Sequence, residues 1–147
     1  MNVAVAAVEV DAANVSSSVQ GYARAADRDL LTPAAVSAMR RLAEAWQLSG
    51  TEAAVLIGAS ATSWTRLCGG TETRPLSQDQ MTRVSALAGV FKALHVLFGD
   101  DIAARWPRLP NNAPVFAERS PLDLMIEDGI PGMIEVRRYL DGLASGV

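Results

Sequence analysis

Apolar residues recur every three or four positions along most of the chain after residue 30, which is the spacing of an amphipathic helix. The longest stripe predicts a helix over about residues 78–98. Its apolar positions are Met81, Val84, Leu87, Ala88, Phe91, Leu94 and Phe98. Shorter stripes predict helices over about 33–47 and 131–143. Because alanine is abundant and β-branched residues are scattered, the pattern predicts an all-α fold.

Residues that favour helix ends set the expected limits of the elements. Thr32 followed by Pro33 predicts an N-cap and a first turn for the 33–47 helix. Three capping boxes are predicted, at Ser49 with Glu52, Ser77 with Gln80, and Ser120 with Asp123. Ser60 is expected to cap the helix that follows it. Glycines then predict the ends of short helices over 50–57, 61–68 and 121–128.

Composition divides the chain into three expected parts. Residues 1–30 are rich in alanine, valine and serine and predict a variable N-terminal arm, in which a short helix over 18–28 is one possibility. Residues 31–107 carry the clearest helix signals. Residues 108–147 begin with a loop rich in proline and asparagine, which can separate two lobes, and form the third part.

Charge and cysteine content exclude several classes of protein. The formal net charge of −3 argues against a polybasic nucleic-acid or membrane binder, although a local basic face stays open. One cysteine excludes an intrachain disulfide, and one histidine argues against a histidine metal cluster, so no metal or cofactor is expected. No stretch reads as a membrane span or a secretory signal, which predicts a cytoplasmic protein.

Residues 50–69, GTEAAVLIGASATSWTRLCG, predict two short helices joined by a turn that contains glycine. Gly58 suits the left-handed conformation of such a turn. Trp64 and Leu67 lie three residues apart and are expected to pack against Val55 and the first helix. The segment therefore predicts a helix-turn-helix. A helical hairpin with no role in DNA binding is the alternative, since it needs the same small residues.

The second helix of this motif, residues 61–68, would be the recognition helix. The residues expected to contact DNA are Ser60, Thr62, Ser63, Thr65, Arg66 and Arg74. Arg83 is a further candidate for the flanking DNA backbone. Hydroxyl groups reach phosphates or base edges, and an arginine can hold guanine or phosphate. This basic set is small, so tight binding is expected to need a dimer or a larger assembly.

A few other residues are of types that act in catalysis, but a role in packing or helix capping explains them better. Cys68 and His95, with Asp100 or Asp101, invite a nucleophile–base interpretation. No third group or oxyanion motif has a readable spacing, so Cys68 is interpreted as a small buried hydrophobic residue. The carboxylates of Asp123, Glu127 and Asp128 are interpreted as a helix cap and a solvated face. The chain is therefore not expected to be an enzyme.

The C-terminal third carries a recognisable combination of motifs. They are Trp106-Pro107, Asn111-Asn112, Phe116, the run Arg119-Ser120-Pro121-Leu122-Asp123-Leu124, Gly129, Val136 and Tyr139-Leu140. With these motifs, residues 113–143 resemble the toxin-binding domain of the Xre/MbcA/ParS antitoxin family. The resemblance extends back through residues 50–69 and covers about residues 32–147, but not the first 30 residues.

The resemblance implies a type II antitoxin encoded beside a RES-domain toxin, an enzyme that depletes NAD. It implies an Xre-like helix-turn-helix bundle that dimerises and binds operator DNA, and a small helical domain that docks on the toxin. The toxin-binding residues it implies are Arg119, Asp123, Glu127, Arg137, Arg138, Tyr139, Leu143, Ala144, Ser145, Gly146 and Val147. Small residues and a terminal carboxylate could enter a cleft built for an anionic nucleotide.

The expected function is therefore neutralisation of that toxin by occlusion of its active site, with repression of the operon through DNA binding. The alternative is a stand-alone Xre-like transcriptional regulator whose C-terminal half serves dimerisation or binds a small ligand.

Overall fold

The computed structural model describes residues 22–146, so most of the predicted N-terminal arm and Val147 lie outside it. Seven α-helices and two short 3₁₀ helices make up this part of the chain, which contains no strand and confirms the all-α prediction. The elements are α3 (Ala25–Ala45), α4 (Gly50–Ile57), α5 (Ala61–Gly69), α6 (Gln78–Phe98), α7 (Asp100–Arg105), η1 (Trp106–Arg108), η2 (Pro114–Phe116), α8 (Pro121–Asp128) and α9 (Ile130–Ala144).

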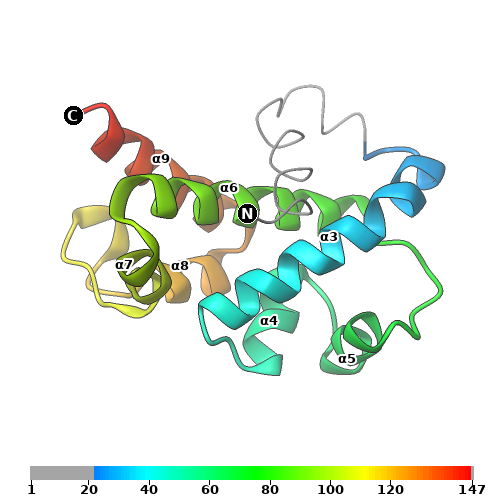
Figure 1. The fold of residues 1–147 in the computed structure, drawn as a ribbon. Helices are drawn as coiled ribbons and strands as arrows, with labels where there is room; N and C mark the ends of the chain where they lie inside the picture. The colour runs from blue at the N-terminus through cyan, green and yellow to red at the C-terminus, as the bar shows by residue number, and fades with distance from the viewer. Residues whose placement is uncertain (1–21, 147) are drawn as a thin grey trace.

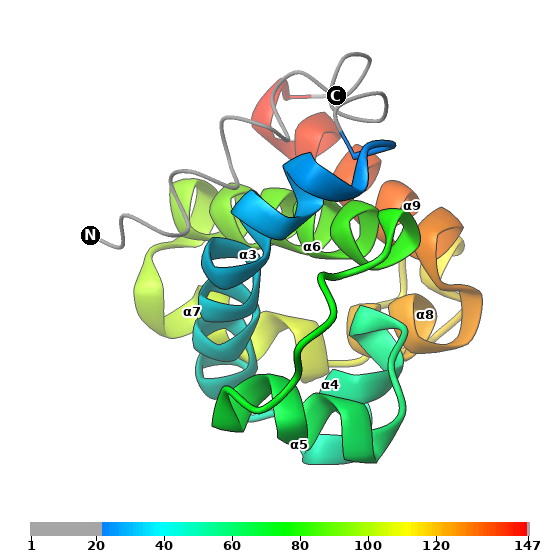
Figure 2. The same ribbon diagram turned by 90° about the vertical axis from the view of Figure 1, so that its right-hand side faces the viewer.

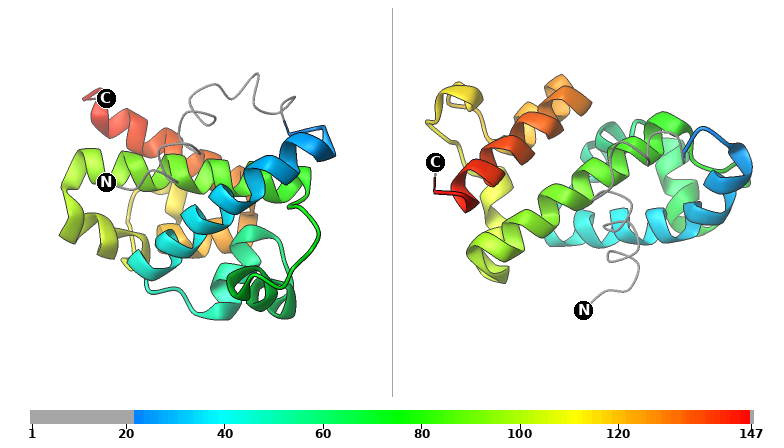
Figure 3. Two further views of the ribbon diagram at one scale, coloured as in Figure 1. Left: turned by 45° about the vertical axis from the view of Figure 1, so that its right-hand side comes forward. Right: turned by 90° about the horizontal axis from the view of Figure 1, so that it is seen from above.

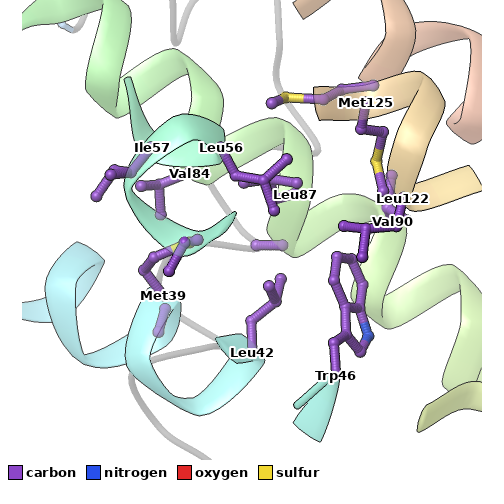
Figure 4. Packing of buried hydrophobic residues seen from close by; sticks show 14 of the residues in the cluster. Met39, Leu42, Trp46, Leu56, Ile57, Val84, Leu87, Val90, Leu122 and Met125 are labelled. Carbon is purple, nitrogen blue, oxygen red and sulfur yellow. The ribbon is translucent and has the colours of Figure 1, made fainter. Parts of the chain in front are cut away.

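Helix α6 is the central element of the fold. α3 and α9 both pack along it, while α4 and α5 lie together at one end of the molecule (Figures 1, 2 and 3). The apolar stripe predicted on this helix is largely buried. Leu42, Leu56, Leu87 and Leu122, from four different helices, point into one shared core (Figure 4). A single hydrophobic core therefore holds the helix-turn-helix segment and the C-terminal helices together.

The same helix is long and apolar enough, by length and composition alone, to cross a membrane. Its apolar residues already face α3, α4 and α9 in the core, which accounts for its hydropathy. Helix α6 is therefore interpreted as a core helix.

The start of α3 differs from the prediction. The helix begins at Ala25 and runs through Pro33, so residues 25–30, expected in the arm, are helical. Thr32 is not an N-cap, because its hydroxyl donates to the Arg28 carbonyl at 2.6 Å and accepts from the Leu76 N–H at 3.0 Å. The Arg28 Nε also donates to the Leu76 carbonyl at 3.0 Å. The segment at Leu76, far along the chain, thus holds the first turns of α3.

The other predicted caps agree closely with the structure. The capping boxes at Ser49 and Ser77 are both present with their reciprocal hydrogen bonds. Ser60 caps α5 by accepting from the Ser63 N–H, and Ser120 caps α8 by accepting from the Asp123 N–H. At Ser120 the structure shows only this half of the predicted box. Local sequence therefore determines where four of the helices begin.

Arg108 joins the C-terminal part of the chain to the turn between α3 and α4. Its Nη2 donates to the Gln47 carbonyl at 2.6 Å and to Glu52 Oε1 at 2.7 Å. Its Nε donates to the Trp46 carbonyl at 2.9 Å. Gln47 has a left-handed backbone, with a φ of 52°, and the arginine satisfies the carbonyl that this turn exposes. One side chain therefore links α3, α4 and η1.

This junction makes stability depend on the ionisation of Glu52. The hydrogen bond from Arg108, followed by the one from the Ser49 backbone, holds the pKa of Glu52 below its ordinary 4.5. A carboxyl group whose pKa is lower in the folded state stabilises the fold above its unfolded pKa. That contribution is lost as the pH falls through the folded pKa.

We expect Glu52→Gln to lower the free energy of unfolding by about 1 kcal/mol near neutral pH. The difference from the wild type should shrink as the pH falls through the lowered folded-state pKa of Glu52, because the wild-type carboxyl is then protonated as well. Urea denaturation at neutral pH and at an acid pH measures this. Glu44→Gln, at an exposed position on α3, is the control and should change little. An equal loss for Glu52→Gln at both pH values would contradict the expectation.

Two glycines of α9 should respond in opposite ways to alanine. A Cβ at Gly132 would lie 2.6 Å from the backbone oxygen of Leu124, whereas a Cβ at Gly142 would meet nothing within 4 Å. Gly132→Ala should therefore push α8 and α9 apart and cost about 2 kcal/mol or more. Gly142→Ala should raise stability by about 0.5 to 1 kcal/mol, because alanine favours the helix. Thermal and urea denaturation of both variants tests the pair; a stable Gly132→Ala protein would contradict the close approach.

Candidate DNA and toxin interfaces

The helix-turn-helix predicted at residues 50–69 is formed by α4 and α5. Gly58 ends α4 in the left-handed conformation, with a φ of 76°, as expected for the turn. Trp64 and Leu67 are buried, but Val55 is 42% exposed and lies on the outer side of α4. Val55 therefore does not belong to the buried side of α4. Ala53, Ala54, Leu56 and Ile57 form the buried side of α4 instead.

The first turns of α6 hold the glycine turn in place. Gln80 Nε2 donates to the Gly58 carbonyl at 3.2 Å. A Cβ at Gly58 would lie 3.0 Å from Arg83 Cδ and 3.2 Å from Asp79 Oδ2. Arg83 is itself paired with Asp79 at 2.8 Å, and its side chain is only 22% exposed. Arg83 therefore packs against the Gly58 turn. Its side chain is less available to DNA than the sequence predicted.

Most of the polar residues predicted on α5 lie on its exposed face. Thr62, Thr65 and Arg66 are exposed, and Ser63 is half-buried. The Ser60 hydroxyl is occupied by the helix cap, and the Thr65 hydroxyl donates to the Ala61 carbonyl at 3.0 Å. Thr62 and Arg66 are thus the side chains of this face with the most freedom to bind.

Arg74 lies on the loop after α5, away from the recognition helix. Its side chain is 81% exposed, and its Nε lies 3.6 Å from Glu72 Oε1. Hydrogen bonds to Glu72, first from the backbone of Arg74, lower the pKa of that carboxyl. A DNA phosphate would have to compete with Glu72 for Arg74.

The structure points to two arginines that the sequence analysis missed. Arg40 and Arg41 are exposed on α3, and like Arg66 they have no carboxylate partner within the described part of the chain. The sequence signal was an adjacent arginine pair on the polar side of the 33–47 helix. α3 packs against α5, and the charge of Arg40 acts on Cys68 of α5, so Arg40 is the one of these two arginines that lies near the helix-turn-helix.

The polar residues predicted to contact a toxin lie on α8, α9 and the turn before α8, and most have partners within the chain. Arg119 pairs with Glu127 at 2.5 Å, Arg137 with Asp141 at 2.9 Å, and Arg138 with Glu135 at 2.9 Å. Arg137 also lies over α6, where a Cβ at Gly89 would be 2.5 Å from its Nη1. Asp123 is exposed on α8.

Tyr139 belongs to an aromatic cluster inside the C-terminal part. Its ring is stacked on Trp106, with centroids 6.2 Å apart, and meets the edge of Phe116 at 5.0 Å. Phe116 is fully buried, and Tyr139 is half-buried. Tyr139 therefore holds α9 against η1 and η2, whatever it contributes to a partner.

The apolar stripe of α9 continues beyond its buried part to the exposed end of the helix. Met133, Val136 and Leu140 form a buried stripe, and Leu143 follows at the same helical spacing. Leu143 is 40% exposed, because the helix has by then passed the edge of the core (Figure 1). Residues 144–146 are exposed as well, and the Ser145 hydroxyl donates to the Asp141 carbonyl at 3.0 Å. The predicted tail is thus accessible as far as Gly146.

Cys68 and His95 do not form the pair that a nucleophile–base mechanism would need. His95 Nδ1 lies 2.8 Å from Asp100 Oδ1, and the ring packs on Phe91 with centroids 4.3 Å apart. Cys68 is partly buried on α5, and burial raises the pKa of its thiol. No hydrogen bond joins Cys68 to His95 in the region that the structure covers. No group of three metal-ligating side chains occurs among residues 22–146 either.

Comparison with known protein families matches both halves of this arrangement. Residues 25–89 match the antitoxin Xre-like helix-turn-helix domain. Residues 93–146 match the antitoxin Xre/MbcA/ParS C-terminal toxin-binding domain. The chain belongs to the Xre/MbcA/ParS antitoxin family. The antitoxin is also similar to the uncharacterized protein y4oB of Sinorhizobium fredii (strain NBRC 101917 / NGR234), with 34% identity over 119 residues. That match covers 78% of the antitoxin and 87% of its relative.

Family membership assigns a general role to each half of the antitoxin. α4 and α5 lie in the helix-turn-helix half, and α8 and α9 lie in the toxin-binding half. The matched regions meet within α6, between residues 89 and 93. The central helix therefore belongs to both halves, which explains why they share one core.

Proposed function

We propose that this antitoxin neutralises a RES-domain toxin that degrades NAD, by covering the toxin's active site with the end of α9. The observation that carries the proposal is the apolar stripe of α9, which continues to the exposed Leu143 beyond the edge of the core. An apolar side chain presented at the end of a helix is a suitable anchor for a pocket in a partner.

The charge of this half also suits such a partner. Residues 108–146 contain six carboxylates and four arginines, so this segment carries a small net negative charge. A cleft that binds the phosphates of NAD is expected to be rich in positive charge. Opposite charge steers the two proteins together and favours the correct orientation.

We further propose that the antitoxin represses its own operon through α5. Thr62 and Arg66 are exposed on the face that would enter the major groove, and the unpaired Arg40 of α3 lies near α5. α5 and the end of α9 lie at opposite ends of the molecule (Figures 1 and 2), so DNA and toxin could be bound together. A homodimer would place two α5 helices on half-sites about one turn of DNA apart, about 34 Å. The dimer and the cytoplasmic location stay predictions.

Co-expression tests the central proposal. The RES-domain protein of the neighbouring reading frame is induced with and without the antitoxin, and growth and cellular NAD are followed. The antitoxin should restore both, and the two proteins should be purified together as one complex. Growth arrest and NAD loss that persist when both proteins are expressed at equal levels would overturn the proposal. If the antitoxin still bound DNA, that result would favour the stand-alone regulator.

A further inference from the structure

The exposed face of α5 has two distinct sides. One turn of an α-helix takes 3.6 residues, so Thr62 and Gly69 lie near the middle of the face opposite the buried Trp64 and Leu67. Arg66 lies on one side of this middle and Thr65 on the other, about equally far round the helix. Cys68 lies further round on the side of Thr65, is partly buried, and marks the edge of the exposed face there.

Arg40 of α3 is close enough to the Cys68 side of α5 for its charge to act there. α3 packs against α5, as the two helices in Figure 2 show. The charge of Arg40 acts on the Cys68 thiol, where it lowers the pKa and so opposes the larger effect of burial. Arg40 is exposed and makes no ion pair among residues 22–146, so its guanidinium is available to an outside anion.

Arg41, the next residue of α3, differs from Arg40 in the direction in which its side chain leaves the helix. Arg41 is also exposed and unpaired within the described region, but successive residues of a helix point about 100° apart. Val36, Arg40 and Ala43 share one side of α3, and Arg41 lies on the other side of the exposed face. The two arginines therefore have equal charge and exposure but different positions relative to α5.

We propose that Arg40 of α3 is a phosphate-binding residue of the DNA interface, which acts on the opposite side of α5 from Arg66. The inference rests on the proposed DNA binding through α5. A helix in the major groove, about 12 Å wide, has a phosphate backbone on each side. Arg66 would contact one backbone and Arg40 the other, so α3 and α5 together fix the helix in the groove. This second contact explains how a recognition helix with a single arginine can be positioned on DNA.

Fluorescence anisotropy with three single variants tests the proposal. The probes are a labelled duplex from the region upstream of the antitoxin's coding sequence and a scrambled duplex of equal length. Binding is measured over a series of salt concentrations. Arg40→Ala and Arg66→Ala should each weaken binding about 5-fold and reduce the salt slope by about 1. Arg41→Ala is the matched control and should stay within about 2-fold of the wild type. Arg40→Lys should keep the salt slope, because a lysine still offers a point charge to a phosphate.

A second measurement checks the position of Arg40 without DNA. In Arg40→Ala the pKa of Cys68 should rise further, so the thiol should react more slowly with a thiol reagent near pH 8, whereas Arg41→Ala should not change its rate. The inference is overturned if wild-type protein binds DNA and Arg40→Ala keeps its affinity and salt slope, or if Arg41→Ala loses as much as Arg40→Ala. If the wild type binds neither duplex, the DNA-binding proposal itself fails and the role of Arg40 fails with it. The thiol measurement then reports whether Arg40 lies beside α5.

Discussion

Removing residues 143–147 should weaken the complex with the toxin at least about 100-fold and abolish neutralisation, while the protein stays folded. The truncated α9 would end at Gly142, after the last buried residue of its stripe, Leu140. Leu143 and the residues up to Gly146 are exposed, so the core loses almost nothing. A toxin pocket that buries Leu143 would lose about 1.5 to 3 kcal/mol from this side chain alone, and more from the rest of the tail.

A point substitution separates the role of Leu143 from that of the tail as a whole. Leu143→Asp places a charge where an apolar pocket is expected and should weaken binding about as strongly as the truncation. Leu30→Asp is the matched control, because Leu30 is 80% exposed on α3 and lies in the helix-turn-helix half. Calorimetry of binding measures the affinity, and circular dichroism confirms the fold. If the truncated protein bound and inhibited the toxin as well as the wild type, the proposed role of the α9 end would be wrong.

Phe116→Ala should lower the free energy of unfolding by about 3 to 5 kcal/mol, the largest effect expected for a single side chain. Phe116 is fully buried in η2, and its ring meets Trp106 at 6.0 Å and Tyr139 at 5.0 Å. These edge-to-face contacts add to the free energy gained from burial. The substitution would leave a cavity between α9 and the segment that begins at η1.

The backbone that follows Phe116 is strained, which makes the loss of the ring more costly to stability. Ala117 and Glu118 both have left-handed backbones, with φ values of 50° and 67°, although neither is glycine. Both the backbone N–H and the Nε of Arg119 donate to the Phe116 carbonyl, at 2.9 and 3.1 Å. The buried ring fixes the carbonyl that these bonds need, so its loss should also release the strained turn.

Chemical denaturation tests this prediction with a graded pair and a control. Phe116→Leu keeps most of the volume and should lose clearly less than Phe116→Ala. Leu109→Ala, in the same connecting region but 51% exposed, should change stability by no more than about 0.5 kcal/mol. If Phe116→Ala does not fold at all, the loss of unfolding free energy in Phe116→Leu can still be compared with that in Leu109→Ala. A loss below about 1 kcal/mol for Phe116→Ala would contradict the importance of the aromatic cluster.

Local sequence by itself determined most of the helices. The bounds of α6 were predicted almost to the residue, because a capping serine, a long apolar stripe and a terminal glycine all act within a few residues. The same local signals fixed the turn at Gly58 and the starts of α4, α5 and α8. The motifs between Trp106 and Leu140, taken together, also indicated the antitoxin family.

Tertiary structure decided what depends on residues far apart in the chain. α3 begins before Pro33, at Ala25, where the sequence predicted no helix start. Hydrogen bonds between Arg28, Thr32 and the backbone at Leu76 hold these first turns, and no local sequence pattern predicts them. The charge of Arg40 acts on Cys68 of α5 only because α3 packs against α5. Leu143 repeats the spacing of Leu140, yet it is exposed because the core ends between them. Helix signals act over one or two turns, whereas burial, ion pairing and exposure are set by which elements meet in space.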